Sequence, residues 1–170
     1  MQEYAAASRE QDEQTSGTRT KIFRAVVVYS GSGSVEKVIR HMYPNAEIEA
    51  MDIKCLSHVN QCMDAKTWMG SRCKYIREGS IDLLWASPPS DQYSVANSSG
   101  QRDFSNADKL AKDALTAIKM INPKHWVIDN PNGLLKTRSF MQHMEKLLHI
   151  TSYCLYGTPR IVKTHVYDQM

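Results

Sequence analysis

Four short segments of the sequence carry the residue types from which a binding or catalytic site is built, and each follows a run of apolar residues. They are Ser30-Gly31-Ser32-Gly33, Asp52, Ser87-Pro88-Pro89-Ser90 and Asp129-Asn130-Pro131. Glycine lets the backbone turn tightly and lets a ligand approach the main chain. A terminal acid accepts hydrogen bonds from ligand hydroxyls, and proline stiffens a loop that holds polar groups against a planar base. These residue types indicate one composite ligand site.

The elements that must position these segments follow from the spacing of apolar residues. Continuous β-branched or apolar runs predict buried strands at 24–29, 47–52, 81–86 and 125–129, the last broken by Asn130 and Pro131. Helical spacing predicts helices over 35–42, with Val35, Val38, Ile39 and Met42 on its apolar face, and over 107–121 and 139–148. Residues 150–156 and 161–167 predict a terminal hairpin.

Strands that alternate with helices predict an α/β fold, here a Rossmann-like sheet, mostly parallel with an antiparallel C-terminal hairpin and helices on both faces. Such sheets bind ligands beyond the carboxyl ends of their strands, so the four segments are expected to share one crevice. Residues 1–20 are polar and are expected to form a disordered leader. Residues 21–170 are expected to form a single domain, and the polar stretch 91–102 a mobile loop.

Composition narrows the class of protein further. The net charge of +3 permits a nucleic-acid partner without demanding one. No apolar run is long enough for a membrane span and the N-terminus is no signal peptide, which predicts an intracellular, cytoplasmic protein without membrane contact. The four cysteines are irregularly spaced, so reduced thiols are expected. Cys55, His58, Cys62 and Cys73 fit no strong zinc pattern, and no metal is expected.

The two-glycine turn points to a particular ligand class. A strand, Gly31-x-Gly33, a helix and a second strand that ends in Asp52 are typical of a site for a nucleoside-containing ligand, with the acid on the ribose hydroxyls. The sequence lacks a third glycine at the dinucleotide spacing, which favours a nucleoside over a pyrophosphate. Asp64 is either an adenine contact or an exposed loop acid. The alternative to the whole pattern is an ordinary tight turn beside a solvated acid.

Five segments together resemble a known family. They are, in chain order, VVVYSGSGSVEKV, DLLWASPPSDQYS, FSNADKLAKDAL, WVIDNPNGLLKTRSFM and YCLYGTPRIVKTHVY. Over about residues 23–167 the chain resembles the compact DNA cytosine-5 methyltransferase-like proteins of phages and viruses. The resemblance implies a class I methyltransferase fold, S-adenosylmethionine as methyl donor and a cytosine in DNA as substrate. It leaves no room for a separate target-recognition domain, so a protein partner is a candidate source of specificity.

The resemblance also implies roles for individual residues. Those implied to bind the cofactor are Ser30, Gly31, Ser32, Gly33, Asp52, Asp64, Ser87 and Pro88. Those implied at the catalytic centre are Ser90, Asp129 and Arg160. Those implied to contact the substrate are Pro89, Asn130, Pro131, Lys163 and Thr164.

Two positions depart from the family pattern. Ser90 stands where the family has its nucleophilic cysteine, and Asp129 stands where the family usually has a glutamate. A thiol ionises near a pKa of ~8.5, whereas a serine hydroxyl needs an adjacent general base, so loss or severe reduction of activity is expected.

Several explanations remain open for the serine. They are a natural inactive variant, an engineered cysteine-to-serine change, and transfer by another nucleophile such as Cys154 or to another atom. The competing functions are a noncatalytic binding module and a methyltransferase that acts on an exocyclic amine or on RNA.

Overall fold

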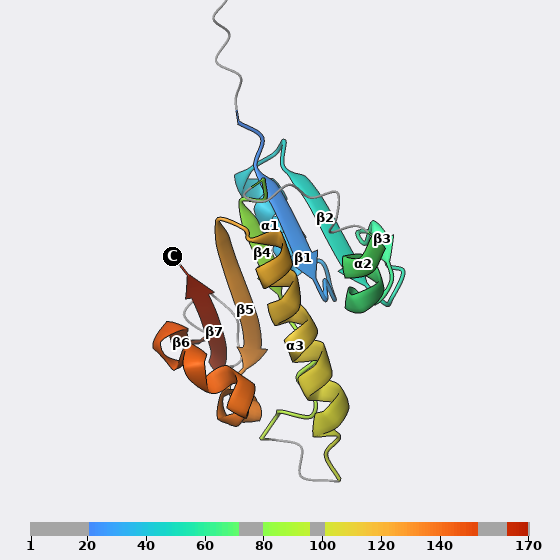
Figure 1. Ribbon diagram of the computed structural model, residues 1–170. Helices are drawn as coiled ribbons and strands as arrows, with labels where there is room; N and C mark the ends of the chain where they lie inside the picture. The colour runs from blue at the N-terminus through green and yellow to red at the C-terminus, as the bar shows by residue number, and fades with distance from the viewer. Residues whose placement is uncertain (1–20, 72–79, 96–100, 153–162, 170) are drawn as a thin grey trace, which may run out of the picture.

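A seven-stranded sheet forms the centre of the protein (Figure 1). The computed structural model describes residues 21–71, 80–95, 101–152 and 163–169. The strands lie in the order β3-β2-β1-β4-β5-β7-β6. Their bounds are β1 Arg24–Val28, β2 Glu47–Asp52, β3 Gln61–Cys62, β4 Leu83–Ala86, β5 His125–Pro131, β6 Leu148–Ser152 and β7 Lys163–Gln169. β1 to β5 pair in parallel, and β7 runs antiparallel to both β5 and β6. The prediction of a mostly parallel sheet with an antiparallel C-terminal pair is confirmed.

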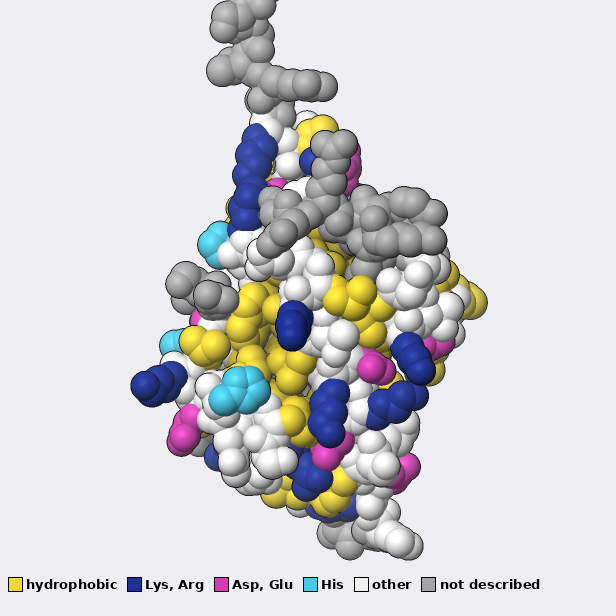
Figure 2. Space-filling model, viewed as in Figure 1, with side chains coloured by type: hydrophobic (Ala, Val, Ile, Leu, Met, Phe, Trp, Pro, Cys, Tyr) yellow, Lys and Arg dark blue, Asp and Glu magenta, His cyan; other side chains and the backbone are white. Residues whose placement is uncertain are grey.

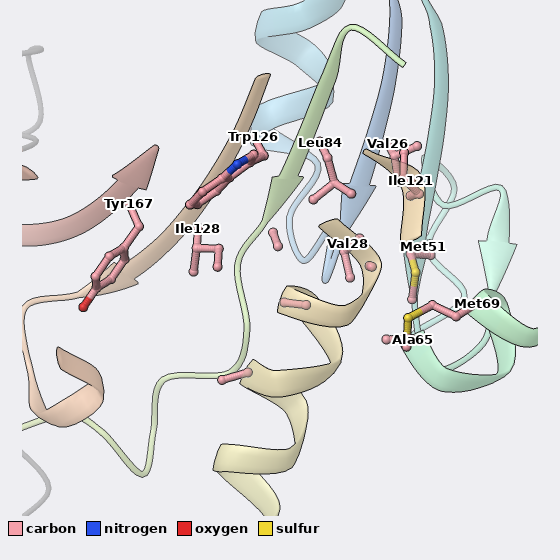
Figure 3. Close-up of a cluster of buried hydrophobic side chains, with 14 of the residues drawn as sticks. Val26, Val28, Met51, Ala65, Met69, Leu84, Ile121, Trp126, Ile128 and Tyr167 are labelled. Atoms are coloured by element: carbon pink, nitrogen blue, oxygen red, sulfur yellow. The ribbon is translucent and has the colours of Figure 1, made fainter. Parts of the chain in front are cut away.

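Helices cover both faces of this sheet. They are α1 Ser34–Met42, α2 Ala65–Ser71, α3 Phe104–Ile121 and the 3-10 helices η2 Leu134–Thr137 and η3 Ser139–Leu147. Alternate residues of β1 divide between the faces, as the pleat of a strand requires. Val26 and Val28 join the larger core with α2 and α3 (Figure 3), whereas Ala25 and Val27 join a smaller core with Ile39 of α1.

Helix α3 lies across the middle of the larger core. It begins three residues before the predicted start because the carboxylate of Asp103 accepts a hydrogen bond from the backbone N–H of Asn106, at 3.1 Å, and caps it. It ends where Asn122 adopts a left-handed conformation. The residues of its buried face are Ala107, Ala111, Ala114, Ala117 and Ile121. Four of these are short alanines, which lets the helix lie close to the sheet.

Several expectations about the elements are wrong. Val38 and Met42 are 57% and 62% exposed, so the buried face of α1 consists of Ile39 and the polar Glu36, with Val35 partly buried against the smaller core. β5 continues through Pro131 instead of ending before Asn130, because β7 pairs with it as far as Thr164. The short elements β3, α2 and η2 were not predicted.

The cysteines also differ from expectation. Cys55 and Cys62 form a disulfide, with Cα atoms 5.0 Å apart, whereas reduced thiols were predicted. The expectation failed because both cysteines lie in the connection between the predicted strands 47–52 and 81–86, where no element was predicted, and become adjacent once β3 pairs with the end of β2. Cys73 and Cys154, like the predicted leader 1–20, lie outside the described residues. In the part of the chain that the structure describes, no helix is both long and apolar enough to cross a membrane.

Candidate functional site

The turn after β1 is held by the acid at the tip of β2. Gly31 and Gly33 have φ angles of 57° and 74°, which L side chains rarely adopt. The N–H of Gly31 donates to one oxygen of Asp52 at 2.9 Å, and the N–H of Lys54 donates to the other at 2.9 Å. A carboxylate offers about four acceptor positions. Asp52 therefore fixes the turn and still has acceptor positions for a ligand.

His58 packs against the same turn, whereas the sequence suggests it only as a possible zinc ligand. Its Nε2 lies 3.1 Å from the carbonyl oxygen of Gly31. A Cβ placed on Gly33 would lie 2.7 Å from Cδ2 of the His58 ring. Two features therefore favour glycine at position 33. Its φ angle is positive, and the His58 ring leaves no space for a Cβ.

The serines of the turn point in different directions. The Ser30 hydroxyl is buried and donates to Oε1 of Glu36, which is itself 3% exposed. Ser32 is exposed, and its hydroxyl is 2.7 Å from that of Ser34. The Ser30 side chain therefore supports the turn from the side of α1, whereas Ser32 is open to solvent.

A cavity of about 270 Å³ connects the glycine turn with the loop after β4. Its lining residues are Tyr29, Gly31, Met51, Asp52, Ile53, Lys54, Met63, Asp64, Ala65, Ser87, Pro89 and Leu110. Most of this wall is apolar, with Asp52 and Asp64 among its polar groups. A cavity is therefore present at the carboxyl ends of β1, β2 and β4, and it brings together five of the predicted site residues. The prediction of one crevice for all four segments is met only in part, because neither Ser90 nor any residue of 129–131 lines this cavity.

Asp64 has a structural role at the edge of this cavity. Its carboxylate accepts hydrogen bonds from the hydroxyl and the backbone N–H of Thr67, at 2.6 and 3.0 Å, and so caps α2. These two hydrogen bonds lower the pKa of Asp64. Tyr29, on the opposite wall, donates its hydroxyl to the carbonyl oxygen of Leu110 at 2.9 Å, and burial raises its pKa. The Tyr29 hydroxyl is therefore neutral at physiological pH and ties α3 to the tip of β1.

The double-proline loop continues directly from β4 beside β1. The N–H of Ser87 donates to the carbonyl of Val28 at 3.1 Å, and the Ser87 hydroxyl accepts from Nε1 of Trp85 at 3.0 Å. The backbone carbonyl of Ser90 accepts from the N–H groups of Tyr93 and Ser94. In the described part of the chain the Ser90 hydroxyl itself has no hydrogen-bond partner.

The two ends of the stretch 91–102, which the sequence predicts as a mobile loop, are anchored by hydrogen bonds, and residues 96–100 lie outside the described residues. Tyr93 is fully buried, and its hydroxyl donates to Asp108 of α3 at 3.0 Å. Arg102 donates to the carbonyls of Gln92 and Ser94 at 2.6 and 2.9 Å. Tyr93 is the one aromatic side chain in this polar stretch, and it is the signal that could have indicated an anchored end.

The loop that ends β5 is joined to the double-proline loop. Asn130 is fully buried, and its side-chain N–H donates to the carbonyl of Pro88 at 2.9 Å. The N–H of Leu134 donates to the carbonyl oxygen of Tyr93 at 2.9 Å. A Cβ on Gly133 would lie 2.2 Å from that same oxygen. The two loops therefore form one unit next to the cavity.

β7 contributes a third side chain to this unit. The hydroxyl of Thr164, which is 1% exposed, lies 2.7 Å from Oδ1 of Asp129 and 2.9 Å from the carbonyl oxygen of Asn130. Of the other predicted substrate residues, Pro131 is exposed at the end of β5. Arg160 and the side chain of Lys163 lie outside the described residues.

The face seen in Figure 2 carries lysine and arginine side chains among hydrophobic, acidic and uncharged ones, without one continuous basic surface. This agrees with the small net charge of +3. Any contact with a nucleic acid on this face would therefore rest on separate basic side chains rather than on a broad positive patch.

Comparison with known proteins gives a likeness of fold. No protein-family model matches the chain, and no curated protein matches it. One similar solved structure is that of a "putative DNA modification methyltransferase" encoded within a prophage of E. coli, with 14% sequence identity and a TM-score of 0.60. The match covers 86% of this chain and 46% of that one, so this chain spans about half the length of its structural neighbour. The fold of this protein is methyltransferase-like.

Proposed function

We propose that this chain is an S-adenosylmethionine-dependent DNA cytosine-5 methyltransferase-like protein in which serine at position 90 impairs the transfer step. The observation that carries the proposal is a single cavity bordered by Gly31, Asp52 and the double-proline loop. Asn130 ties the Asp-Asn-Pro loop to that same unit. A nucleoside site and a base site are adjacent only when these strand tips converge in this way.

The residues of the cavity suit the cofactor. Its apolar wall, which includes Met51, Ile53 and Leu110, fits an adenine ring, and the remaining acceptor positions of Asp52 suit two ribose hydroxyls. The volume of about 270 Å³ lies just below the range of ligand pockets, roughly 300–1,000 Å³. This suits the nucleoside part, with the methionine part over the exposed backbone of Gly31. When bound, the cofactor supplies a methyl group on a positively charged sulfur.

The base site depends on the chain's own residues at the tips of β4 and β5. A target base must leave the DNA stack to reach a buried pocket. Thr164 holds the carboxylate of Asp129 in place, and a carboxylate can accept a hydrogen bond from the amino edge of cytosine. Ser90 would have to attack carbon 6 of the base, which needs an adjacent general base, but in the described part of the chain its hydroxyl forms no hydrogen bond to a side chain that could take the proton. The expected outcome is binding with little or no transfer.

DNA as the substrate is supported by the description of the structural neighbour. An intracellular location, in the cytoplasm or nucleoid, follows from a DNA substrate. A protein partner that supplies sequence specificity is part of the same proposal.

The second candidate is a noncatalytic module that binds cofactor or DNA. It is favoured by one observation, which is that the Ser90 hydroxyl has no hydrogen-bond partner within the described residues and so nothing to activate it. The exocyclic-amine alternative is less well supported. Methyltransferases that act on an exocyclic amine place an aromatic residue after the two prolines to stack on the base, and Ser90 stands there instead.

The cofactor half is tested by calorimetry. S-adenosylmethionine is titrated into the wild type, Asp52→Asn and the matched control Glu47→Gln, which changes an exposed acid at the other end of β2. Loss of charge-assisted hydrogen bonds is expected to weaken binding by about 10- to 100-fold in Asp52→Asn. Equal affinity in the wild type and Asp52→Asn, or no binding by the wild type, would contradict the assignment.

The chemistry is tested by restoring the thiol. Ser90→Cys is incubated with cofactor and DNA, and 5-methylcytosine is measured by mass spectrometry of the released nucleosides. Ser94→Cys, a thiol four residues further on, is the control and is expected to give no product. Cofactor binding without methylation by Ser90→Cys would refute the cytosine-5 mechanism and favour the noncatalytic module.

A further inference from the structure

The disulfide between Cys55 and Cys62 lies beside residues that line the proposed cofactor cavity. It joins the segment that follows β2 to the strand β3, seven residues further on, and both cysteines are exposed. Ile53 and Lys54, just before the first cysteine, line the cavity. Met63 and Asp64, just after the second, line it as well. The crosslink therefore connects two stretches of the same wall.

Residues 53–59 support the glycine turn but are weakly held, whereas Asn60, just before β3, forms three hydrogen bonds with β2. His58 contacts the carbonyl of Gly31 and packs against Gly33. Ile53 and Leu56 are 70% and 43% exposed, so they bury little apolar surface. For described residues 53–59, the hydrogen bonds recorded to residues outside the range 53–62 are those of Lys54 to Asp52 and of His58 to Gly31. Segments with few buried contacts open at low free-energy cost, so residues 53–59 are constrained mainly by the covalent bond and by the hydrogen bonds of Asn60 to β2.

We propose that the Cys55–Cys62 pair is a redox switch that sets the affinity of the cavity for an adenosine-bearing ligand. This rests on the proposed cofactor site. A dithiol reductant supplies two electrons and two protons. The S–S bond breaks, both cysteines become thiols, and the reductant forms its own disulfide. Oxidation by a disulfide compound reverses each change.

Reduction removes the covalent closure of residues 55–62. His58 then leaves Gly33 more often, and the wall must be ordered again when a ligand binds. Ordering the backbone of one residue corresponds to about a tenfold change in affinity. The reduced protein is therefore expected to bind about tenfold more weakly than the oxidised protein.

The test uses S-adenosylhomocysteine as the probe and the full chain. Calorimetric titrations are made after equilibration with oxidised glutathione or with dithiothreitol. The variants are Cys55→Ser/Cys62→Ser, which cannot form the bond, and the matched control Cys73→Ser. The wild type and Cys73→Ser should lose about tenfold in affinity on reduction. The double variant should bind weakly in both conditions. Equal affinity of the oxidised and reduced wild type would overturn the proposal.

A second measurement needs no ligand and separates failure of the switch from failure of the cofactor site. Amide exchange followed by NMR reports the N–H groups of Gly31 and Lys54, both of which donate to Asp52. Their exchange should accelerate on reduction in the wild type and be equally fast in both conditions in the double variant. If no ligand binds but exchange responds, the cofactor assignment fails and the switch stands. Unchanged exchange, or alkylation of Cys55 and Cys62 in the oxidised chain, refutes the switch.

Discussion

The packing of His58 against Gly33 makes a quantitative prediction for Gly33→Ala. An L residue in the left-handed conformation costs about 1–2 kcal/mol. The new Cβ would also lie 2.7 Å from the ring of His58, and overpacking of this kind costs about 1–3 kcal/mol. The free energy of unfolding should therefore fall by about 2–5 kcal/mol, the sum of these two costs.

Two further variants separate the two costs. Gly31→Ala is the matched control, because Gly31 also has a positive φ but a Cβ there would meet no atom closer than 3.9 Å. It should cost only the backbone part, about 1–2 kcal/mol. In a His58→Ala background the overpacking disappears, so Gly33→Ala should also fall to about 1–2 kcal/mol. The difference between backgrounds is the coupling free energy of the pair.

The assay is urea unfolding, monitored by tryptophan fluorescence, of the wild type, Gly33→Ala, His58→Ala and the double variant. Gly31→Ala is measured in parallel with Gly33→Ala. Equal costs of Gly33→Ala in the wild-type and His58→Ala backgrounds would refute the reasoning, because they would show that the His58 ring does not limit the space beside Gly33. Equal costs of Gly31→Ala and Gly33→Ala would refute it in a second way.

Two other predictions concern buried polar groups. Asn130→Ala should lower the free energy of unfolding by about 1–3 kcal/mol in urea titrations, because the carbonyl of Pro88 loses its buried donor; a change within experimental error would contradict the contact. Asp82 is 8% exposed at its side chain; burial raises its pKa, but hydrogen bonds from Lys124 and Lys21 outweigh that effect and lower it. A lowered pKa stabilises the protein above the unfolded value of ~3.9, and this contribution is lost as the pH falls through the folded value. Acid unfolding curves should therefore show a weaker pH dependence below about pH 4 in Asp82→Asn, and superimposable slopes would contradict the role.

The parts of the fold that the sequence predicted are those with strong local signals. The apolar runs of β1, β2 and β4 and the turns after them are set by residues close in sequence, and the convergence of their tips follows from parallel pairing. These two features, the local apolar runs and the parallel pairing, are sufficient to predict that Asp52 lies beside the two-glycine turn.

The missed features depend on contacts between distant residues. β3 has two residues and no periodicity, and it forms where Asn60 bonds the backbone of β2 at Ile48 and Ala50. The anchoring of residues 91–95 needs Gly133 and Asp108, which come from other elements. The disulfide needs the pairing of β3. None of these has a local pattern that sequence reasoning could detect.

The way in which the Ser90 loop is held has a consequence for how this protein could change. The backbone at position 90 is fixed by the N–H groups of Tyr93 and Ser94, and Tyr93 is fixed in turn by Gly133 and Asp108. None of these interactions involves the side chain at position 90. One oxygen atom can thus be exchanged for sulfur without rebuilding the surroundings, so under the proposed function loss and recovery of the nucleophile are separated by a single substitution that carries almost no folding penalty.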